Sequence, residues 1–408
     1  MIVFKKLSLV LIMLISVLLG SCSPISSPAN TITPTMAVVS TTTNIPTEVS
    51  TPTNNPDFTN LTTNCVEILN TPPIDVKLSG LLALSSPSSG SYILNLETNE
   101  KTYLKGDSLG ELIVSPDMQK IAYIDYDTSK LIIYNTSDKK SITFHDFNGR
   151  FRLANWLDNK NLVINKAKED KPDYYHYSLV IFDSQTSNIQ EFNIGDFPNS
   201  DIYSTGYLYL FPNPQITKMV YLAGDVEKSV VLFDTQSEVQ LREIYFIDSA
   251  PLWTRDGEEF AISAVLKFDK YSNFADNLPY LGGDEIFLAN AIGEIRRLTF
   301  LATRYPNNYI TSLSWSPTKE YIAFNLQNST QPDFGLSILN INTGEIVNYC
   351  IQDNWDHIYW SPDRKQIAFT RWGSLGSSQA KVYILDLEKN RVFKIADNAT
   401  VAGWMINK

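Results

Sequence analysis

Short apolar runs, each introduced by a polar turn, recur along the chain from about residue 80 to its end. Proline at the second position and aspartate at the third favour a turn, and the apolar residues that follow are typical of a short β-strand. A helical period of 3.6 residues is hard to find beyond the N-terminal segment. Six nine-residue segments share the pattern and align without gaps: SPDMQKIAY (115–123), WLDNKNLVI (156–164), NPQITKMVY (213–221), TRDGEEFAI (254–262), SPTKEYIAF (316–324) and SPDRKQIAF (361–369).

A second pattern repeats downstream of each turn, where an apolar run ends in asparagine or aspartate. The seven run ends are Asn95, Asn135, Asp183, Asp234, Asn290, Asn340 and Asp386. Their mean spacing of about 48 residues is typical of propeller blades. Each unit predicts a four-stranded antiparallel meander, and seven units predict an all-β, seven-bladed β-propeller. A six-bladed ring is the alternative, and it requires one of the seven run ends to be dismissed.

The two ends of this repeat region complement each other. The first unit, from about Gly80 to Leu104, lacks the turn and tryptophan that open the other units. The last eight residues, VAGWMINK, supply a strand of the missing kind, with Trp404 placed after Trp360 at the spacing of one repeat. We therefore expect the C-terminal strand to complete the first blade beside the Leu81–Leu84 run, which removes two exposed sheet edges. Trp404 should pack between blades, as should Trp253, Trp315 and Trp360.

The segments LWTRDGEEFAI, SWSPTKEYIAF and WSPDRKQIAF, together with EIFLANAIGEIRRLTF, resemble the WD-repeat-like motif of TolB-like propellers. The resemblance covers about residues 78–408 and implies the fold rather than a function. Related propellers also precede the hydrolase domain of prolyl oligopeptidase-like peptidases. The GxSxG elbow of that domain is missing here, since GSLGS at 373–377 lies inside a propeller unit.

The N-terminus has the features of a bacterial lipoprotein signal peptide. Lys5 and Lys6 precede an apolar run, Leu7 to Leu19, that is shorter than the ~20 residues of a spanning helix. Leu19-Gly20-Ser21-Cys22 resembles a lipobox, a resemblance that implies cleavage before Cys22 and acylation of that residue. We assign 1–21 to the signal peptide and expect a membrane-anchored protein outside the cytoplasmic membrane. An ordinary secretory signal with a chance cysteine is the alternative.

The segment that follows Cys22 has the composition of a disordered tether. Of the 42 residues from Ser23 to Asn64, 29 are Ser, Thr, Pro or Asn. Such a segment buries too little apolar surface to offset its ordering entropy. We therefore divide the mature chain into a lipidated tether, 22–64, and a propeller domain, 65–408. The tether departs from the pattern of TolB itself, so a Tol–Pal role does not follow from the resemblance.

Composition excludes several classes of function. A net charge of −11 disfavours nucleic acid as a partner, because that binding depends on Lys and Arg clusters. The chain has three histidines and three cysteines and no CxxC or HExxH spacing, so we expect neither a metal site nor a cofactor. Calcium would need oxygen ligands, for which Asp125 with Asp127, Asp269 with Asp276, and Asp284 with Glu285 are the candidates. No EF-hand or nonapeptide calcium repeat accompanies them.

Once Cys22 is acylated, Cys65 and Cys350 are the two remaining thiols. In an oxidising compartment an even remainder suggests a disulfide. Such a bond would fix the end of the tether to the ring, and residues 58–77 would then have to run across its rim.

We expect the links between second and third strands to share one face of the ring, where long loops carry function. The longest are 166–178 and 266–285. Exposed aromatic side chains there would anchor a partner or stack on sugars, although they could equally fold back over the rim. The candidate binding residues are Tyr174, Tyr175, His176, Tyr177, Tyr271, Phe274, Tyr280 and Trp372.

Two functions are compatible with this sequence. The first is a non-catalytic, lipid-anchored scaffold that binds a protein, peptide or glycan on its loop-rich face. The second is an extracytoplasmic propeller enzyme acting on carbohydrate, for which His176 or His357 would line the channel mouth. The absence of a fixed acid–base pair from the repeats favours the first.

Lipidation of Cys22 is directly testable. Metabolic labelling with a fatty-acid analogue should mark the wild-type protein, and Cys22→Ala should abolish the label because the acylated thiol is removed. Equal labelling of the two proteins would contradict the assignment.

Overall fold

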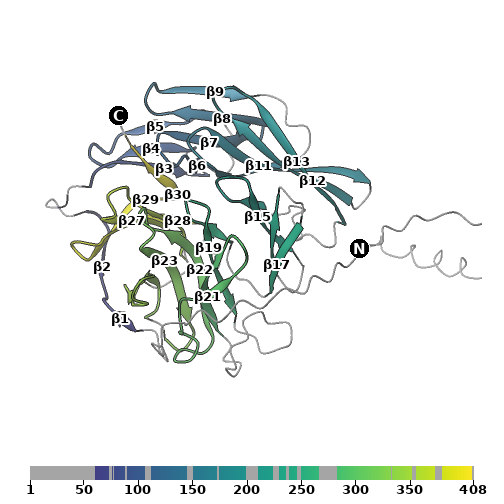
Figure 1. Ribbon diagram of the computed structural model, residues 1–408. Helices are drawn as coiled ribbons and strands as arrows, with labels where there is room; N and C mark the ends of the chain where they lie inside the picture. Colours follow the sequence, from purple (N-terminus) through teal and green to yellow (C-terminus); the bar gives the residue numbers. More distant parts are fainter. Residues whose placement is uncertain are drawn as a thin grey trace, which may run out of the picture. The chain divides into compact units, whose positions relative to one another are not determined.

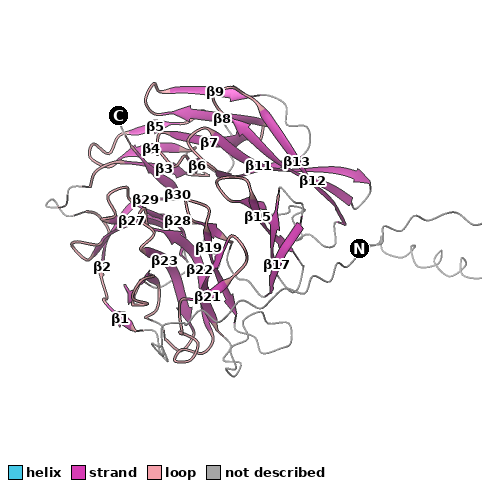
Figure 2. Cartoon of the chain, in the orientation of Figure 1, coloured by secondary structure: helices cyan, strands magenta, loops and turns pink. Residues whose placement is uncertain are grey.

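A computed structural model describes residues 60–72, 76, 78–87, 90–105, 112–144, 150–171, 174–198, 210–223, 229–235, 239–245, 250–265, 283–331, 333–351, 355–372 and 379–406. Residues 55–408 form one compact unit. Among the described residues of this unit, the regular elements are β-strands (Figure 2). No helix long and apolar enough to cross a membrane occurs among the described residues. The predicted signal peptide and Cys22 lie outside them.

The described strands form seven sheets, each with four antiparallel strands. In six of them the four strands follow one another in the chain as a meander, and in the seventh β30 stands before β3, β4 and β5. The first strands are β30 (Thr400–Met405), β6 (Ile113–Val114), β10 (Arg150–Trp156), β14 (Leu210–Pro212), β18 (Leu252–Trp253), β22 (Asn308–Trp315) and β26 (Trp355–Trp360). The second strands are β3 (Leu81–Ser85), β7 (Lys120–Asp125), β11 (Asn161–Lys171), β15 (Lys218–Ala223), β19 (Glu259–Val265), β23 (Tyr321–Asn328) and β27 (Gln366–Trp372).

The third and fourth strands complete each meander. The third strands are β4 (Tyr92–Asn95), β8 (Lys130–Asn135), β12 (Tyr174–Asp183), β16 (Ser229–Asp234), β20 (Asp284–Asn290), β24 (Leu336–Asn340) and β28 (Ala380–Asp386). The fourth strands are β5 (Lys101–Tyr103), β9 (Lys140–Phe144), β13 (Ile189–Pro198), β17 (Val239–Tyr245), β21 (Ile295–Arg297), β25 (Ile346–Asn348) and β29 (Arg391–Asp397). The predicted all-β propeller architecture is thus confirmed.

Three of the turns that the sequence repeats predict share one geometry. The hydroxyls of Ser115, Thr254 and Ser361 each donate to the aspartate two residues later, at 2.6 Å. The same hydroxyls accept the amide that opens the second strand. The fourth residue of these turns has positive φ, as at Met118 (59°) and Arg364 (66°), a conformation that reverses the chain within few residues.

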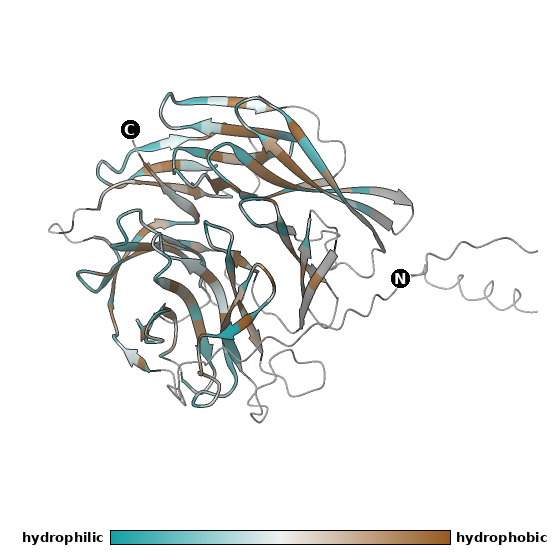
Figure 3. Cartoon of the chain, in the orientation of Figure 1, coloured by the Kyte–Doolittle hydropathy of each residue, from teal (hydrophilic) through white to brown (hydrophobic). Residues whose placement is uncertain are grey.

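The predicted run ends form the second set of turns. Asn95 Oδ1 accepts the amides of Glu97 and Thr98, at 2.9 and 3.2 Å. Asn135, Asp183, Asn290, Asn340 and Asp386 accept the amide two residues later in the same way. Asn and Asp end these strands because their side chains satisfy the free amides of the turn. Figure 3 shows hydrophilic residues at such turns and hydrophobic residues within the strands.

Tryptophan indoles connect neighbouring sheets through a repeated hydrogen bond. Each indole lies at or near the end of a first strand and donates its Nε1–H to a carbonyl of the first strand in the preceding sheet. The pairs are Trp156 to Ile113 (3.1 Å), Trp253 to Phe211 (2.8 Å), Trp315 to Leu252 (3.0 Å), Trp360 to Ser314 (3.1 Å) and Trp404 to Tyr359 (3.0 Å).

The C-terminal strand joins the first sheet, as predicted. Strand β30 pairs with β3 in antiparallel register, with Leu81 opposite Met405 and Leu82 opposite Trp404 (Figure 1). Trp404 is buried in a cluster that combines Leu82 and Leu84 with Val382 and Phe393 of the last sheet. Its predicted position between two sheets is therefore confirmed.

The segment before the first sheet adds one outer strand to each of two other sheets. Strand β1 (Leu61–Thr63) pairs in parallel with β25, and β2 (Glu67–Leu69) pairs in parallel with β29. The predicted boundary of the tether at residue 64 is therefore too late. Polar composition misled the prediction, because backbone pairing to an open sheet edge does not need apolar side chains.

Between β1 and β2, Cys65 forms the predicted disulfide with Cys350. Their Cα atoms lie 4.8 Å apart. Cys350 lies two residues after the end of β25, so the bond fixes the crossing segment between the two sheets that it covers. In the chain-entropy model, closing a loop of this length contributes about 4 kcal/mol or more.

Truncation of Trp404 should destabilise the domain strongly. We expect Trp404→Ala to lower the free energy of unfolding by about 3–5 kcal/mol, because it leaves a cavity between two sheets. Trp404→Phe should cost less, since it loses the indole N–H but keeps most apolar contacts. Trp372→Ala, at a side chain that is 36% exposed, is the matched control. Urea denaturation measures all three, and equal midpoints for Trp404→Ala and the parent would contradict the packing described.

Turns of neighbouring sheets also interact through charge. The Lys319 ammonium donates to Asp256, which also accepts from the Thr254 hydroxyl. The Lys319 hydrogen bond first, then that of Thr254, lowers the pKa of Asp256 from 3.8 to about 2. Because the folded-state pKa is the lower one, this pair stabilises the domain above pH 3.8 and loses its effect as pH falls toward 2.

Lys319→Met should therefore reduce stability near neutral pH and lose this acid dependence. Both side chains are partly exposed, so the effect should be about 1 kcal/mol or less. Lys139→Met is the control, because Lys139 also has positive φ in a turn and makes no ion pair with the described residues. Denaturation at pH 7 and pH 1.5, which is below the folded-state pKa of Asp256, should give curves that differ between Lys319→Met and parent at the higher pH only.

Candidate functional site

The end of the sheets opposite the repeated turns carries exposed aromatic side chains. Second strands finish there and first strands begin there, as the pairing of Arg371 with Trp355 shows. Tyr126, Tyr309 and Trp372 are 55, 46 and 36% exposed at this end. Trp372 was predicted. Tyr126 and Tyr309 were missed, although Tyr126 lies in DYDTS, the short link between β7 and β8.

An aspartate–histidine pair lies on the first strand β26 at the same end. Asp356 Oδ2 is 3.3 Å from His357 Nδ1, and Asp356 Oδ1 accepts the His357 amide at 2.7 Å. The Ser312 hydroxyl of the neighbouring first strand donates to Asp356 Oδ1 at 3.3 Å. Both strands are irregular here, with positive φ at Ser312 and His357. The irregular backbone brings polar groups of two sheets together beside an exposed carboxylate.

Residues 166–178, which were predicted to form a loop, belong instead to a β-hairpin. Strand β11 continues to Lys171 and β12 begins at Tyr174, with Lys168 opposite His176. A third strand, β13, pairs along the full length of β12 (Figure 1). Polar residues continue the strands because the ladder depends on backbone groups and on these partners rather than on local hydrophobicity.

The hairpin's predicted aromatic residues do not all face solvent. Tyr177 is buried with Ala167 and Met219, so its predicted exposure is wrong. Tyr177 points to the opposite face from its polar neighbours His176 and Ser178, because successive strand residues point to opposite faces. His176 is partly exposed. Tyr174 and Tyr175 lie within β12, and nothing further is described of their side chains.

Polar side chains on the other face of this hairpin form a cross-strand cluster. The Ser178 hydroxyl donates to Glu191 Oε1 at 2.5 Å, and Lys166 Nζ lies 3.0 Å from the same oxygen. The hydrogen bond from Ser178, followed by that from Lys166, lowers the pKa of Glu191. Glu191 therefore stays ionised and stabilises the polar face of an extended sheet.

The acidic pairs considered for calcium have other partners. Asp284 Oδ2 accepts the Ile310 amide at 2.8 Å, and Glu285 accepts the Leu301 and Ala302 amides at 3.0 and 2.7 Å. Arg297 Nη2 lies 2.9 Å from Glu285 Oε1. Burial raises the pKa of Glu285, and the Arg297 guanidinium opposes that rise. These groups fix the link that leads into β22.

Asp125, another of the carboxylates considered for calcium, is a turn residue. Asp125 accepts from the Asp127 amide and the Thr128 hydroxyl, as a turn residue does. Tyr271, Phe274, Tyr280, Asp269 and Asp276 lie outside the described residues. Within the described ranges, no group of three or more His, Cys, Asp or Glu side chains could hold a metal ion.

The turn-bearing end has a contact between two sheets that are not neighbours in chain order. Arg255 Nη2 donates to the Pro116 carbonyl at 3.2 Å. Arg255 belongs to the turn between β18 and β19, and Pro116 to the turn between β6 and β7. The sequence carries no signal for this contact, because the contact depends on how the turns converge in space.

Searches against protein-family models and curated proteins find no match. Among solved structures, the chain is similar to an acylaminoacyl peptidase from Pyrococcus horikoshii at 14% identity and a TM-score of 0.51. That alignment covers 78% of this chain and 50% of the peptidase, so the chain matches only half of that enzyme's length.

Two further structures resemble the chain at lower TM-scores. TolB from Acinetobacter baumannii aligns at 13% identity and a TM-score of 0.46, over 79% of this chain and 82% of that one. The Cps50 (Swd1) β-propeller domain of Myceliophteria thermophila aligns at 14% identity and 0.44, over 81% and 96%. The chain is thus structurally similar to TolB and WD-repeat propellers at low identity, and the similarity concerns the fold alone.

Proposed function

We propose that this protein is a lipid-anchored, extracytoplasmic β-propeller that binds a protein, peptide or glycan without chemical turnover. The observation that supports the proposal best is the set of exposed aromatic side chains Tyr126, Tyr309 and Trp372 at one end of the sheets. Large aromatic side chains anchor protein interfaces and stack on sugar rings. The lipobox-like sequence ending at Cys22 supports the anchored location.

We take the seven sheets to be the blades of one ring, with a six-bladed ring as the alternative. Five indole hydrogen bonds run from a sheet to the one before it, and one of them, from Trp404 to Tyr359, joins the first sheet to the last. A rigid ring would hold the three aromatic side chains at fixed positions, which reduces the entropy lost on binding.

The binding proposal is testable with full-length protein as bait in crosslinking to intact envelopes. Tyr309→Ala combined with Trp372→Ala should reduce capture of the bound component by about tenfold or more, because aromatic anchors dominate interface energetics. Tyr103→Ala is the matched control, since Tyr103 is 56% exposed but lies on the outer strand β5. Equal loss in the control and the double variant would contradict a binding face at this end.

A carbohydrate-active enzyme is the second candidate, and Asp356 with His357 is the observation that favours it. A carboxylate beside an imidazole could orient the ring for general acid–base chemistry. If this reading holds, His357→Ala should abolish turnover of a polysaccharide while leaving its binding intact. Binding without turnover in the parent protein would support the scaffold instead.

A further inference from the structure

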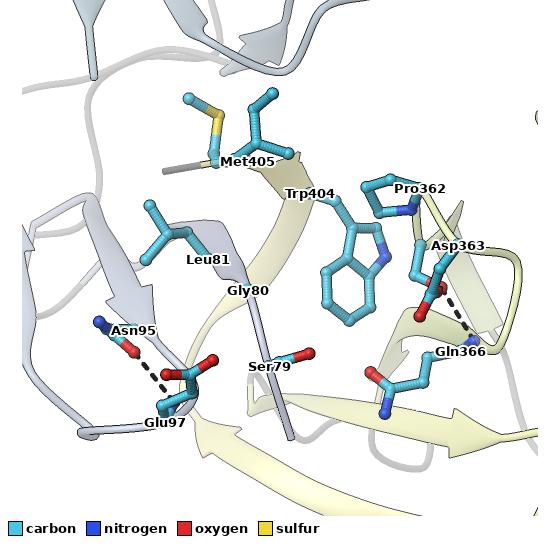
Figure 4. A pocket seen from close by; sticks show the side chains of 12 residues that line it. Ser79, Gly80, Leu81, Asn95, Glu97, Pro362, Asp363, Gln366, Trp404 and Met405 are labelled. Carbon is cyan, nitrogen blue, oxygen red and sulfur yellow. Dashed lines mark hydrogen bonds between the residues drawn. The ribbon is translucent and has the colours of Figure 1, made fainter. Parts of the chain in front are cut away.

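A cavity of about 390 Å³ opens on the turn-bearing side between the first sheet and the last (Figure 4). Glu97, from the turn between β4 and β5, borders it on one side. Asp363, from the turn between β26 and β27, and Gln366, the first residue of β27, border it on the other. The indole of Trp404 forms part of the wall between them, with Gly80 against its six-membered ring, where an added Cβ would lie 3.6 Å from Cε3.

At two other junctions on this side, each turn places a cation on the turn before it. Lys319, the fourth residue of its turn, donates to Asp256, the third residue of the preceding turn. Arg364, again a fourth residue, lies 3.5 Å from both Thr318 Oγ1 and Glu320 Oε2 of the preceding turn. At these two junctions a basic side chain fills the space between consecutive turns.

The junction between the last sheet and the first cannot repeat this arrangement. Its first and second strands, β30 and β3, come from distant parts of the chain, so no hairpin turn joins them. Asp363 is the third residue of the last turn and has no following turn to supply its cation. The cavity lies where that turn would be.

Neither Glu97 nor Asp363 forms an ion pair with the residues that the structure describes. Asp363 Oδ1 accepts the Ser361 hydroxyl and the Lys365 amide, at 2.6 and 3.1 Å. Glu97 accepts no hydrogen bond at its carboxylate from the described residues. The two basic side chains that follow Asp363 in the chain have other ion-pair partners, Lys365 with Glu388 at 2.7 Å and Arg364 with Glu320.

We propose that this cavity binds a guanidinium or ammonium group carried on a peptide turn of a partner protein. The basic group would lie between Glu97 and Asp363, where charge-assisted hydrogen bonds are available. The aliphatic stem of the arginine or lysine would pack along the Trp404 wall, because such stems bury readily against apolar surface. The partner would thus supply the cation that a following turn supplies elsewhere.

The test uses a capped synthetic peptide with the sequence of residues 361–366, SPDRKQ, added to the full-length protein. Its neutral analogue carries citrulline for arginine and norleucine for lysine. Free arginine amide is the third probe and separates a peptide ligand from a small amine. The Trp404 indole N–H resonance, assigned by its loss in Trp404→Phe, reports occupancy of the cavity.

The basic peptide should shift this resonance saturably and bind about tenfold more tightly than the neutral analogue or arginine amide. Glu97→Gln should remove about the same factor, and Glu100→Gln, in the same turn but outside the cavity lining, should leave the affinity unchanged. Equal binding of basic and neutral peptides, equal affinity in Glu97→Gln, or an unmoved Trp404 resonance would each overturn the proposal. Tighter binding of arginine amide would overturn the peptide as its source.

Discussion

The hydrogen bond from a tryptophan indole to a carbonyl of the preceding sheet is the constraint on which the arrangement of sheets depends. A buried indole N–H needs an acceptor, and here the acceptor belongs to the neighbouring first strand at five positions. The bond fixes how far one sheet slides along the next, which apolar contact alone would not do. That register sets the positions of the repeated turns, of the opposite end with its exposed aromatic side chains, and of the cavity beside Trp404.

The outer edges of two sheets are covered by added strands. Strands β1 and β2 add in parallel to β25 and β29, and the disulfide between Cys65 and Cys350 lies between them. Covering an outer edge removes a row of unpaired backbone groups that could otherwise pair with another chain. The segment nearest the predicted tether is thus attached to two sheets, so a pull on the proposed anchor would be borne by strand pairing and a covalent bond together.

Much of this structure could be predicted from the sequence where the signal is local and repeated. The Ser-Pro-Asp turns, the Asn and Asp strand ends and the C-terminal strand that completes the first sheet all have local patterns. The long hairpin of β11 and β12 did not, because its polar residues become strand only through pairing with β13. Tyr177 is buried because of its place in the alternation of faces along β12. That alternation can be assigned only once the strand itself is known. The exposed Tyr309 and the Arg255 contact likewise depend on packing between units distant in sequence.

Closure of the first sheet by the last strand is the central claim, and complementation tests it most directly. A chain lacking residues 401–408 loses the partner of β3 and the Trp404 side chain at once, so it should unfold at lower temperature or aggregate. A synthetic peptide spanning residues 398–408, added during refolding, should restore the melting temperature saturably, and the same peptide with Trp404→Ala should not. A truncated chain that melts like the parent, or no difference between the two peptides, would contradict closure through β30 and its indole.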